Sequence, residues 1–167
     1  MWLTILPTTL RTTARAAAGT NPADPYRVLT PEEAETLSAV TAQIIPSDDT
    51  PGAREAQVVR FLDLSLAGFA KEELPLYRSG VVELNAKARR LDPSAASFAG
   101  LPDEKQAELL RSLESAASPF FESVLAATLT GMFADPEYGG NRDKIGWRLI
   151  GFEDRFAWGP PFGDYDA

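Results

Sequence analysis

Apolar residues in the middle of this chain recur at intervals of three and four positions, and no stretch alternates convincingly with a period of two. Intervals of three and four place side chains on one face of an α-helix, whereas a half-buried strand needs alternation. One clear stripe, which we expect to lie in the core, consists of Val58, Leu62, Leu66 and Phe69. The spacing therefore predicts an all-α fold, a small irregular helical bundle.

Prolines and capping residues set the expected helix boundaries. Thr30, Pro31 and Glu33 form a capping box with proline at the first helical position, which predicts a helix over residues 31–45. A cluster of turn-forming residues over 46–52 ends that helix. Further helices are predicted over residues 53–70, 76–91, 103–115 and 119–133.

Two of these helices carry wide apolar faces. The helix over 76–91 has one apolar face, made of Val81, Leu84, Ala88 and Leu91. The helix over 119–133 has the widest apolar band in the chain, made of Phe120, Phe121, Val124, Leu125, Leu129, Met132 and Phe133. Such a band predicts burial nearly all round, either as the central helix of the bundle or as a helix covered by a partner protein.

The chain of 167 residues is long enough for one domain with a proper core. We expect a single helical domain over residues 28–167, preceded by an N-terminal segment and linker over 1–27. That segment is uncharged up to Leu10, and its first cations are Arg11 and Arg15, which is the wrong order for an ordinary secretory signal. A degenerate signal and no signal both stay open, and no window is long and apolar enough for a membrane span.

The composition changes from about residue 135 onward, where glycines, prolines and aromatic residues become dense. This predicts an extended, aromatic-rich and Gly/Pro-rich C-terminal tail over about 135–167. Large aromatic side chains on an irregular backbone are difficult to bury within the tail itself. We therefore expect the tail to fold back over the bundle, to cover another protein, or to do both.

Two residue types are missing, since the chain has no histidine and no cysteine. This excludes a histidine base, a cysteine nucleophile, thiolate or imidazole zinc sites and cysteine-ligated iron–sulfur clusters. The net charge of −8 also disfavours nucleic acid and anionic membrane surfaces as partners. An acidic excess of this kind is ordinary for soluble domains and indicates no cationic partner.

No local motif indicates catalysis. Gly139 and Gly140 do not belong to a nucleotide-binding pattern. The acidic residues over 135–143 do not form a calcium-binding loop, because Gly139 occupies the third ligand position and no glutamate closes the loop at the twelfth. Adjacent acidic pairs such as Asp48 with Asp49 are typical of solvated surface. The Arg142–Asp143 pair, next to two glycines, predicts a rigid loop that this pair clamps shut.

Two segments near the C-terminus carry a family resemblance. Residues 131–143 (GMFADPEYGGNRD) followed by 146–152 (GWRLIGF) strongly resemble the signature of the gluconate 2-dehydrogenase subunit 3 family. Upstream, residues 29–33 (LTPEE) and 44–53 (IIPSDDTPGA) resemble the opening helix of that family and the loop that follows it. The resemblance runs in the right order over about residues 28–152.

The resemblance implies an accessory subunit with no catalytic, cofactor-binding or metal-binding residues of its own. In such complexes a large flavoprotein of the glucose–methanol–choline oxidoreductase type holds FAD and oxidises the sugar or sugar acid, and it often passes electrons to a cytochrome c subunit with haem. The small subunit helps the flavoprotein mature and in many members carries it through the twin-arginine export route. The resemblance therefore implies a periplasmic location.

This chain departs from the family at its N-terminus, where adjacent arginines are expected ahead of an apolar stretch. Here Arg11 and Arg15 are separated by three residues. Export by this chain is therefore in question. An upstream start, a degenerate signal and a cytoplasmic complex, the alternative location, all stay open.

We expect the partner-binding surface to comprise the loop over 133–143 and aromatic residues of the tail, since aromatic side chains contribute large buried area for little lost freedom. The candidate residues are Phe133, Tyr138, Gly139, Gly140, Asn141, Arg142, Asp143, Trp147, Phe152 and Trp158. Two other functions stay open: a free-standing helical adaptor without a redox partner, and an enzyme that uses carboxylates.

Overall fold

The computed structural model describes residues 26–155, so residues 1–25 and the predicted partner residue Trp158 lie outside the described part. The described residues form α-helices and short 3₁₀-helices without a strand, which confirms the all-α prediction. The α-helices are α2 (Pro31–Ile44), α3 (Val58–Ala67), α4 (Leu74–Leu91), α5 (Asp103–Ser115), α6 (Pro119–Phe133) and α7 (Ile145–Leu149). The 3₁₀-helices are η1 (Lys71–Glu73), η2 (Phe98–Gly100), η3 (Pro136–Tyr138) and η4 (Arg142–Lys144).

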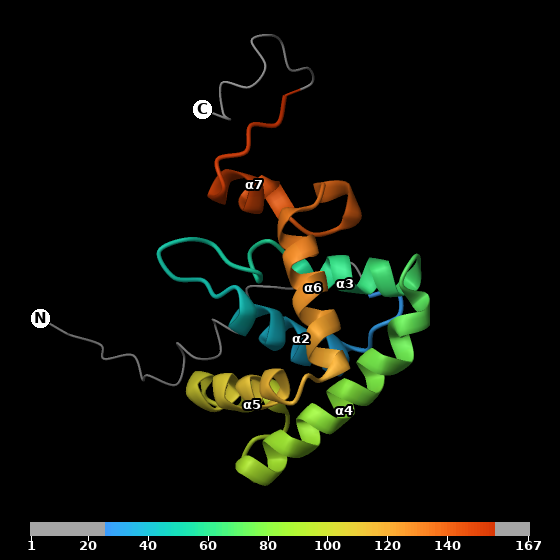
Figure 1. The fold of residues 1–167 in the computed structure, drawn as a ribbon, viewed down its shortest axis with the longest axis vertical. Coiled ribbons are helices and arrows are strands. Elements are labelled where there is room, and N and C mark those ends of the chain that lie inside the picture. Colours follow the sequence, from blue (N-terminus) through green and yellow to red (C-terminus); the bar gives the residue numbers. More distant parts are fainter. Residues whose placement is uncertain (1–25, 156–167) are drawn as a thin grey trace, which may run out of the picture.

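Helix α2 begins at the predicted capping box and occupies the middle of the bundle. The Thr30 hydroxyl accepts a hydrogen bond from the Glu33 amide at 3.2 Å, and the Thr30 amide donates to the Glu33 carboxylate at 2.8 Å. Helices α3, α4, α5 and α6 all contact α2 (Figure 1). Its side chains Leu37 and Val40 are fully buried, so α2 supplies the centre of the core.

A carboxylate in α3 holds the residues just ahead of α2. The Asp63 side chain is buried, and it accepts hydrogen bonds from the amides of Arg27, Val28 and Leu29 at 2.7, 3.0 and 3.1 Å. Three donors compensate the carboxylate for the water that it loses on burial. Asp63 thereby holds the segment just ahead of α2 against α3.

Helix α3 is shorter than the predicted helix over 53–70. It begins at Val58 because Gln57, with φ of 55°, lies in the left-handed region and interrupts the helical backbone. It ends at Ala67, and Phe69 lies beyond that end with 78% of its surface exposed. The assignment of Phe69 to the apolar core stripe was therefore wrong, because that stripe depended on the helix continuing.

Buried polar side chains join α2, α4 and the loop before α5. Thr36 and Asn85 are hydrogen-bonded to each other across α2 and α4, and the Asn85 carbonyl oxygen also accepts from the Phe98 amide at 2.9 Å. Phe98 is itself fully buried. On the same helix Leu91, predicted to share the apolar face of α4, lies in the last turn and is 38% exposed.

Helix α6 crosses the bundle and contacts α2, α3, α4 and α5 on its inner side (Figure 1). Its outer side is open, since Ala126 and Thr130 are exposed and Leu129 is 47% exposed. Among residues 26–155 the bundle thus does not bury α6 nearly all round, so the expectation of a fully enclosed central helix was wrong for the part of the chain that the structure describes. Leu129 follows the helical period but lies about 100° from the buried face. Coverage of this side by a partner stays a prediction.

Candidate partner-binding surface

Residues 134–155, which we name the C-terminal lobe, fold onto the C-terminal end of α6 (Figure 1). The lobe consists of η3, η4 and α7 joined by tight turns, and it contacts both α6 and α3. The predicted tail is therefore not extended in its first part. It forms a compact unit of short helices that lies at the end of the bundle.

One amide side chain, Asn141, holds the lobe together. It is fully buried, and its side-chain Nδ2 donates to the Ala134 carbonyl while its Oδ1 accepts from the Gly146 amide, each at 2.8 Å. Its backbone amide also donates to the Gly131 carbonyl at 2.8 Å. Asn141 adopts φ of 44°, a left-handed conformation that asparagine tolerates better than most residues. This residue therefore connects the end of α6 to the start of α7.

Glycines let the lobe approach the backbone of α6 closely. A Cβ atom added to Gly140 would lie 2.1 Å from the carbonyl oxygen of Gly131, and one added to Gly146 would lie 1.8 Å from that of Met132. Gly139 has a different role, because its φ of 96° is a conformation that glycine adopts without strain. The lobe therefore requires glycine at these positions for steric reasons.

The aromatic residues of the lobe are anchored on one side and exposed on the other. The Trp147 indole nitrogen donates to the Phe133 carbonyl at 2.7 Å, and the Trp147 and Phe152 ring centroids lie 5.0 Å apart. The Lys144 ammonium lies 5.9 Å from the centre of the Trp147 ring and also pairs with Asp154. Rigid aromatic groups held in this way lose little conformational freedom on binding a partner.

The outer surface of the lobe is apolar for its size. Tyr138 is 52% exposed, Ile150 is 60% exposed and Phe152 is 45% exposed, and Leu149 is exposed as well. Such side chains on a small, rigid unit are typical of a protein-binding surface. Leu149 and Ile150 are not among the partner residues predicted from the sequence, although they form an aliphatic pair directly before a glycine in an aromatic-rich segment.

Comparison with known proteins identifies the family of this chain. A sequence model described as "Gluconate 2-dehydrogenase subunit 3" matches residues 31–154, well over half of the chain. The chain belongs to the gluconate 2-dehydrogenase subunit 3 family. Searches of curated proteins and of solved structures found no match.

The family motif over residues 131–143 and 146–152 corresponds to the end of α6 and to the lobe. In this member of the family the motif residues do two different jobs. Gly140 and Asn141 are buried and shape the lobe, and Phe133, Gly139 and Trp147 are partly buried supports. Tyr138, Arg142, Asp143 and Phe152 are exposed and are the predicted partner residues that the structure presents at the surface.

The expected clamp between Arg142 and Asp143 does not close the loop. Their nearest charged atoms lie 3.8 Å apart, and both side chains are more than half exposed. A solvent-exposed pair of neighbours of this kind contributes little to stability. The Asn141 side chain and the Arg142 backbone amide, which donates to the Ala56 carbonyl, close it instead.

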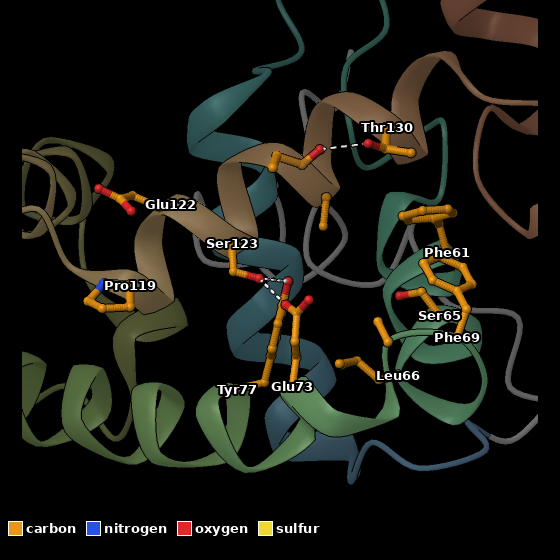
Figure 2. A pocket seen from close by; sticks show the side chains of 13 residues that line it. Phe61, Ser65, Leu66, Phe69, Glu73, Tyr77, Pro119, Glu122, Ser123 and Thr130 are labelled. Atoms are coloured by element: carbon orange, nitrogen blue, oxygen red, sulfur yellow. Dashed lines mark hydrogen bonds between the residues drawn. The ribbon is translucent and has the colours of Figure 1, made fainter.

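A groove lies between α6 on one side and α3, η1 and the start of α4 on the other (Figure 2). Its volume is about 480 Å³. Phe61, Leu66 and Phe69 supply much of its apolar wall. In Figure 2 the side chains of Glu73 and Tyr77 converge on Ser123 across the gap.

The direction of the hydrogen bonds at the polar end of the groove can be assigned. The Ser123 hydroxyl oxygen lies 2.5 Å from the Glu73 carboxylate and 3.0 Å from the Tyr77 hydroxyl. Because a serine hydroxyl has one proton and a carboxylate only accepts, Ser123 donates to Glu73 and accepts from Tyr77. Burial raises the pKa of Tyr77 to about 12, and the negative charge of Glu73 acts in the same direction.

The adjacent carboxylates considered for chemistry lie at the surface. Asp48 and Asp49 are exposed in the loop after α2. Among residues 26–155 no three acidic side chains gather closely enough to hold a metal ion. Over the same range no helix is both long enough and apolar enough to span a bilayer.

Proposed function

We propose that this chain is a non-catalytic small subunit that binds and stabilises a large FAD-dependent dehydrogenase acting on sugars or sugar acids. The family match supports a role as subunit 3 of a gluconate dehydrogenase complex. The observation that carries the proposal is the lobe itself, because the family motif constructs a rigid platform whose outer side chains are apolar and exposed. A platform of this kind suits protein binding and offers no reactive group.

Family membership implies how the chemistry is divided between the subunits. The large partner, a flavoprotein of the glucose–methanol–choline type, would bind FAD and oxidise the sugar or sugar acid. Where a cytochrome c subunit with haem belongs to the complex, it would accept the electrons. This chain lacks histidine and cysteine, the common axial ligands and thiol anchors for haem, and its contribution is to the folding and stability of the partner.

We also propose that the complex works in the periplasm and that this chain assists maturation of the flavoprotein. Family membership is the support for both statements. The separated Arg11 and Arg15 do not supply the arginine pair that twin-arginine export requires. If this chain does not direct export, the flavoprotein carries its own signal or the complex stays in the cytoplasm, and fractionation of cells that express tagged chain distinguishes these outcomes.

The first experiment is to tag this chain in its native host, purify it gently and record the gel pattern and the visible spectrum. We expect a companion several times larger with flavin absorbance, and added haem bands if a cytochrome belongs to the complex. A colourless, solitary chain would favour the free-standing adaptor, and sugar oxidation by the chain alone would favour a carboxylate enzyme.

Variants of the lobe then locate the interface. Ile150→Ala and Phe152→Ala each remove exposed apolar surface, and we expect each to weaken capture of the flavoprotein by about tenfold, as buried interface anchors do. Val82→Ala is the matched control, since Val82 is 68% exposed on α4, away from the lobe. Tyr138→Ala should resemble Phe152→Ala, whereas Trp147→Ala should also loosen the lobe because Trp147 bonds to Phe133. Equal capture by all variants would remove the lobe from the interface.

A further inference from the structure

The groove between α3 and α6 combines apolar walls with charge of a single sign. Apart from Tyr77, the ionisable side chains that line it are Glu73 and Glu122, both acidic. The apolar part includes two aromatic rings, Phe61 and Phe69, whose centroids lie 6.3 Å apart. The most exposed large apolar side chain of the described residues, Phe69, is at this groove.

The Glu73 carboxylate is oriented before any ligand arrives. Ser123 donates to one of its oxygens, and Tyr77 in turn fixes Ser123. A carboxylate has about four acceptor positions, so the Ser123 hydrogen bond leaves Glu73 able to accept from a cationic group. Orientation in advance reduces the entropy that a charged contact would otherwise cost.

We propose that this groove receives a segment of the large dehydrogenase subunit that presents an apolar face followed by a lysine or arginine, whose cation bonds to Glu73. This inference rests on the proposed function for the identity of the partner. The methylene stem of lysine or arginine would lie along the apolar wall while its charged end reaches the carboxylate. The exposed outer side of α6, with Ala126 and Leu129, runs from the groove toward the lobe, so one partner can contact both.

Charge also argues against a second copy of this chain as the occupant. The chain carries a net charge of −8, so two copies repel each other, and an acidic groove adds to that repulsion. A partner segment with a basic residue instead gains from charge complementarity at the groove.

The chemical preference of the groove can be measured on the full chain without the partner. We would titrate isotope-labelled chain with 4-phenylbutylamine, which joins an aromatic ring and an alkyl stem to a cation, and with the neutral probe 4-phenylbutanol. We expect amide shifts at Phe69, Ser123 and Ala126, and an affinity for the amine that is about fivefold higher than for the alcohol, as for a charge-assisted hydrogen bond. Glu73→Gln should abolish that difference, and Glu114→Gln on α5 should preserve it.

Several outcomes of this titration would overturn the proposal. These are equal affinities for the two probes, shifts confined to residues outside the groove, and a difference that survives in Glu73→Gln. A dimer that Glu73→Lys dissociates would assign the groove to a second copy. An amine affinity that rises about tenfold in the Arg11→Glu, Arg15→Glu double variant would assign it to the N-terminal segment of this chain.

The second measurement uses the complex. Glu73→Lys reverses the charge and Ala126→Trp fills the groove from an exposed position, and we expect each to weaken capture of the flavoprotein by about tenfold or more. Glu114→Lys, the matched charge reversal elsewhere, should change it less than about twofold. Normal capture by both groove variants would overturn this inference while the proposed function stands. If wild-type chain captures no flavoprotein, the proposed function fails, and the preference for the amine still reports the chemistry of the groove.

Discussion

The helical body and the C-terminal lobe are held together by different forces. The body, residues 26–133, buries a large apolar cluster around α2, whose side chains include Leu37, Leu62 and Leu84. The lobe buries few large apolar side chains, and it depends on the hydrogen bonds of Asn141 and on glycines in close contact with α6. Apolar burial spreads stability over many contacts, whereas the hydrogen bonds of one buried side chain concentrate it.

This difference indicates what each region can tolerate. A core that is defined by volume and polarity accepts other apolar residues of similar size at modest cost. A lobe that depends on one amide and on backbone contacts accepts almost no change at those positions. The segments over 131–143 and 146–152 that resemble the family signature fall on the region of the second kind and on the end of α6.

The largest effect that separates the two regions is expected from Asn141→Ala. It leaves the Ala134 carbonyl and the Gly146 amide without their partner, and each unpaired buried group costs roughly 1–3 kcal/mol. Alanine at a left-handed φ costs about 1 kcal/mol more. We expect the lobe to open, with loss of amide-exchange protection over residues 134–155 and retention of protection in α2.

Leu62→Ala is the matched comparison in the body. Leu62 is fully buried, and its truncation should lower the free energy of unfolding by about 3 kcal/mol. Amide exchange should then rise in both regions, because the body unfolds as one unit and the lobe loses the helices on which it packs. Loss of amide-exchange protection in the body of the Asn141→Ala variant would contradict this distinction. Loss of protection confined to the lobe of the Leu62→Ala variant would contradict it too.

An intermediate effect is expected from alkaline pH on the body. The pKa of Tyr77 is about 12 in the folded chain, above the value of about 10 for an unfolded chain. Neutral Tyr77 therefore favours the folded state up to about pH 10, and this contribution is lost as the pH rises toward 12, to a total of about 2–3 kcal/mol.

Urea unfolding from pH 8 to 12 measures this loss, with Tyr77→Phe as the control because phenylalanine does not titrate. The wild-type chain should lose more stability than the variant between pH 10 and 12. Parallel curves for the two proteins would show that Tyr77 ionises in the folded state as easily as in the unfolded state.

The smallest effect is expected from Arg142→Ala. Its pair with Asp143 is long and exposed, so the free energy of unfolding should change by less than about 0.5 kcal/mol. Thermal unfolding of this variant beside Asn141→Ala tests the point. A loss of stability comparable to that of Asn141→Ala would show that the charged pair does hold the loop closed.

The sequence was informative where structure is determined by neighbours along the chain. The capping box at Thr30 and Glu33 predicted the start of α2, since both partners lie within four residues. Helical period also predicted the bounds of α5 and the extent of α6. The late start of α3 was not predictable in this way, because glutamine at position 57 carries no signal for a left-handed backbone.

The candidate sites were only partly predictable. The motif directed attention to the lobe, but whether Asn141 points outward or inward depends on α6, which no local pattern reports. The polar end of the groove was missed altogether. Glu73, Tyr77 and Ser123 meet from positions about fifty residues apart, and such a meeting is a property of the packed bundle rather than of any short segment.

Asp63 also determines an order of events during synthesis. Its hydrogen-bond partners at residues 27–29 precede it by 34 to 36 positions. A ribosome that adds about 5–20 residues per second needs about two to seven seconds to make that stretch. Throughout this interval the amides of residues 27–29 exist without their acceptor, so their three hydrogen bonds form only after Asp63 has been made and α3 has packed against the start of α2.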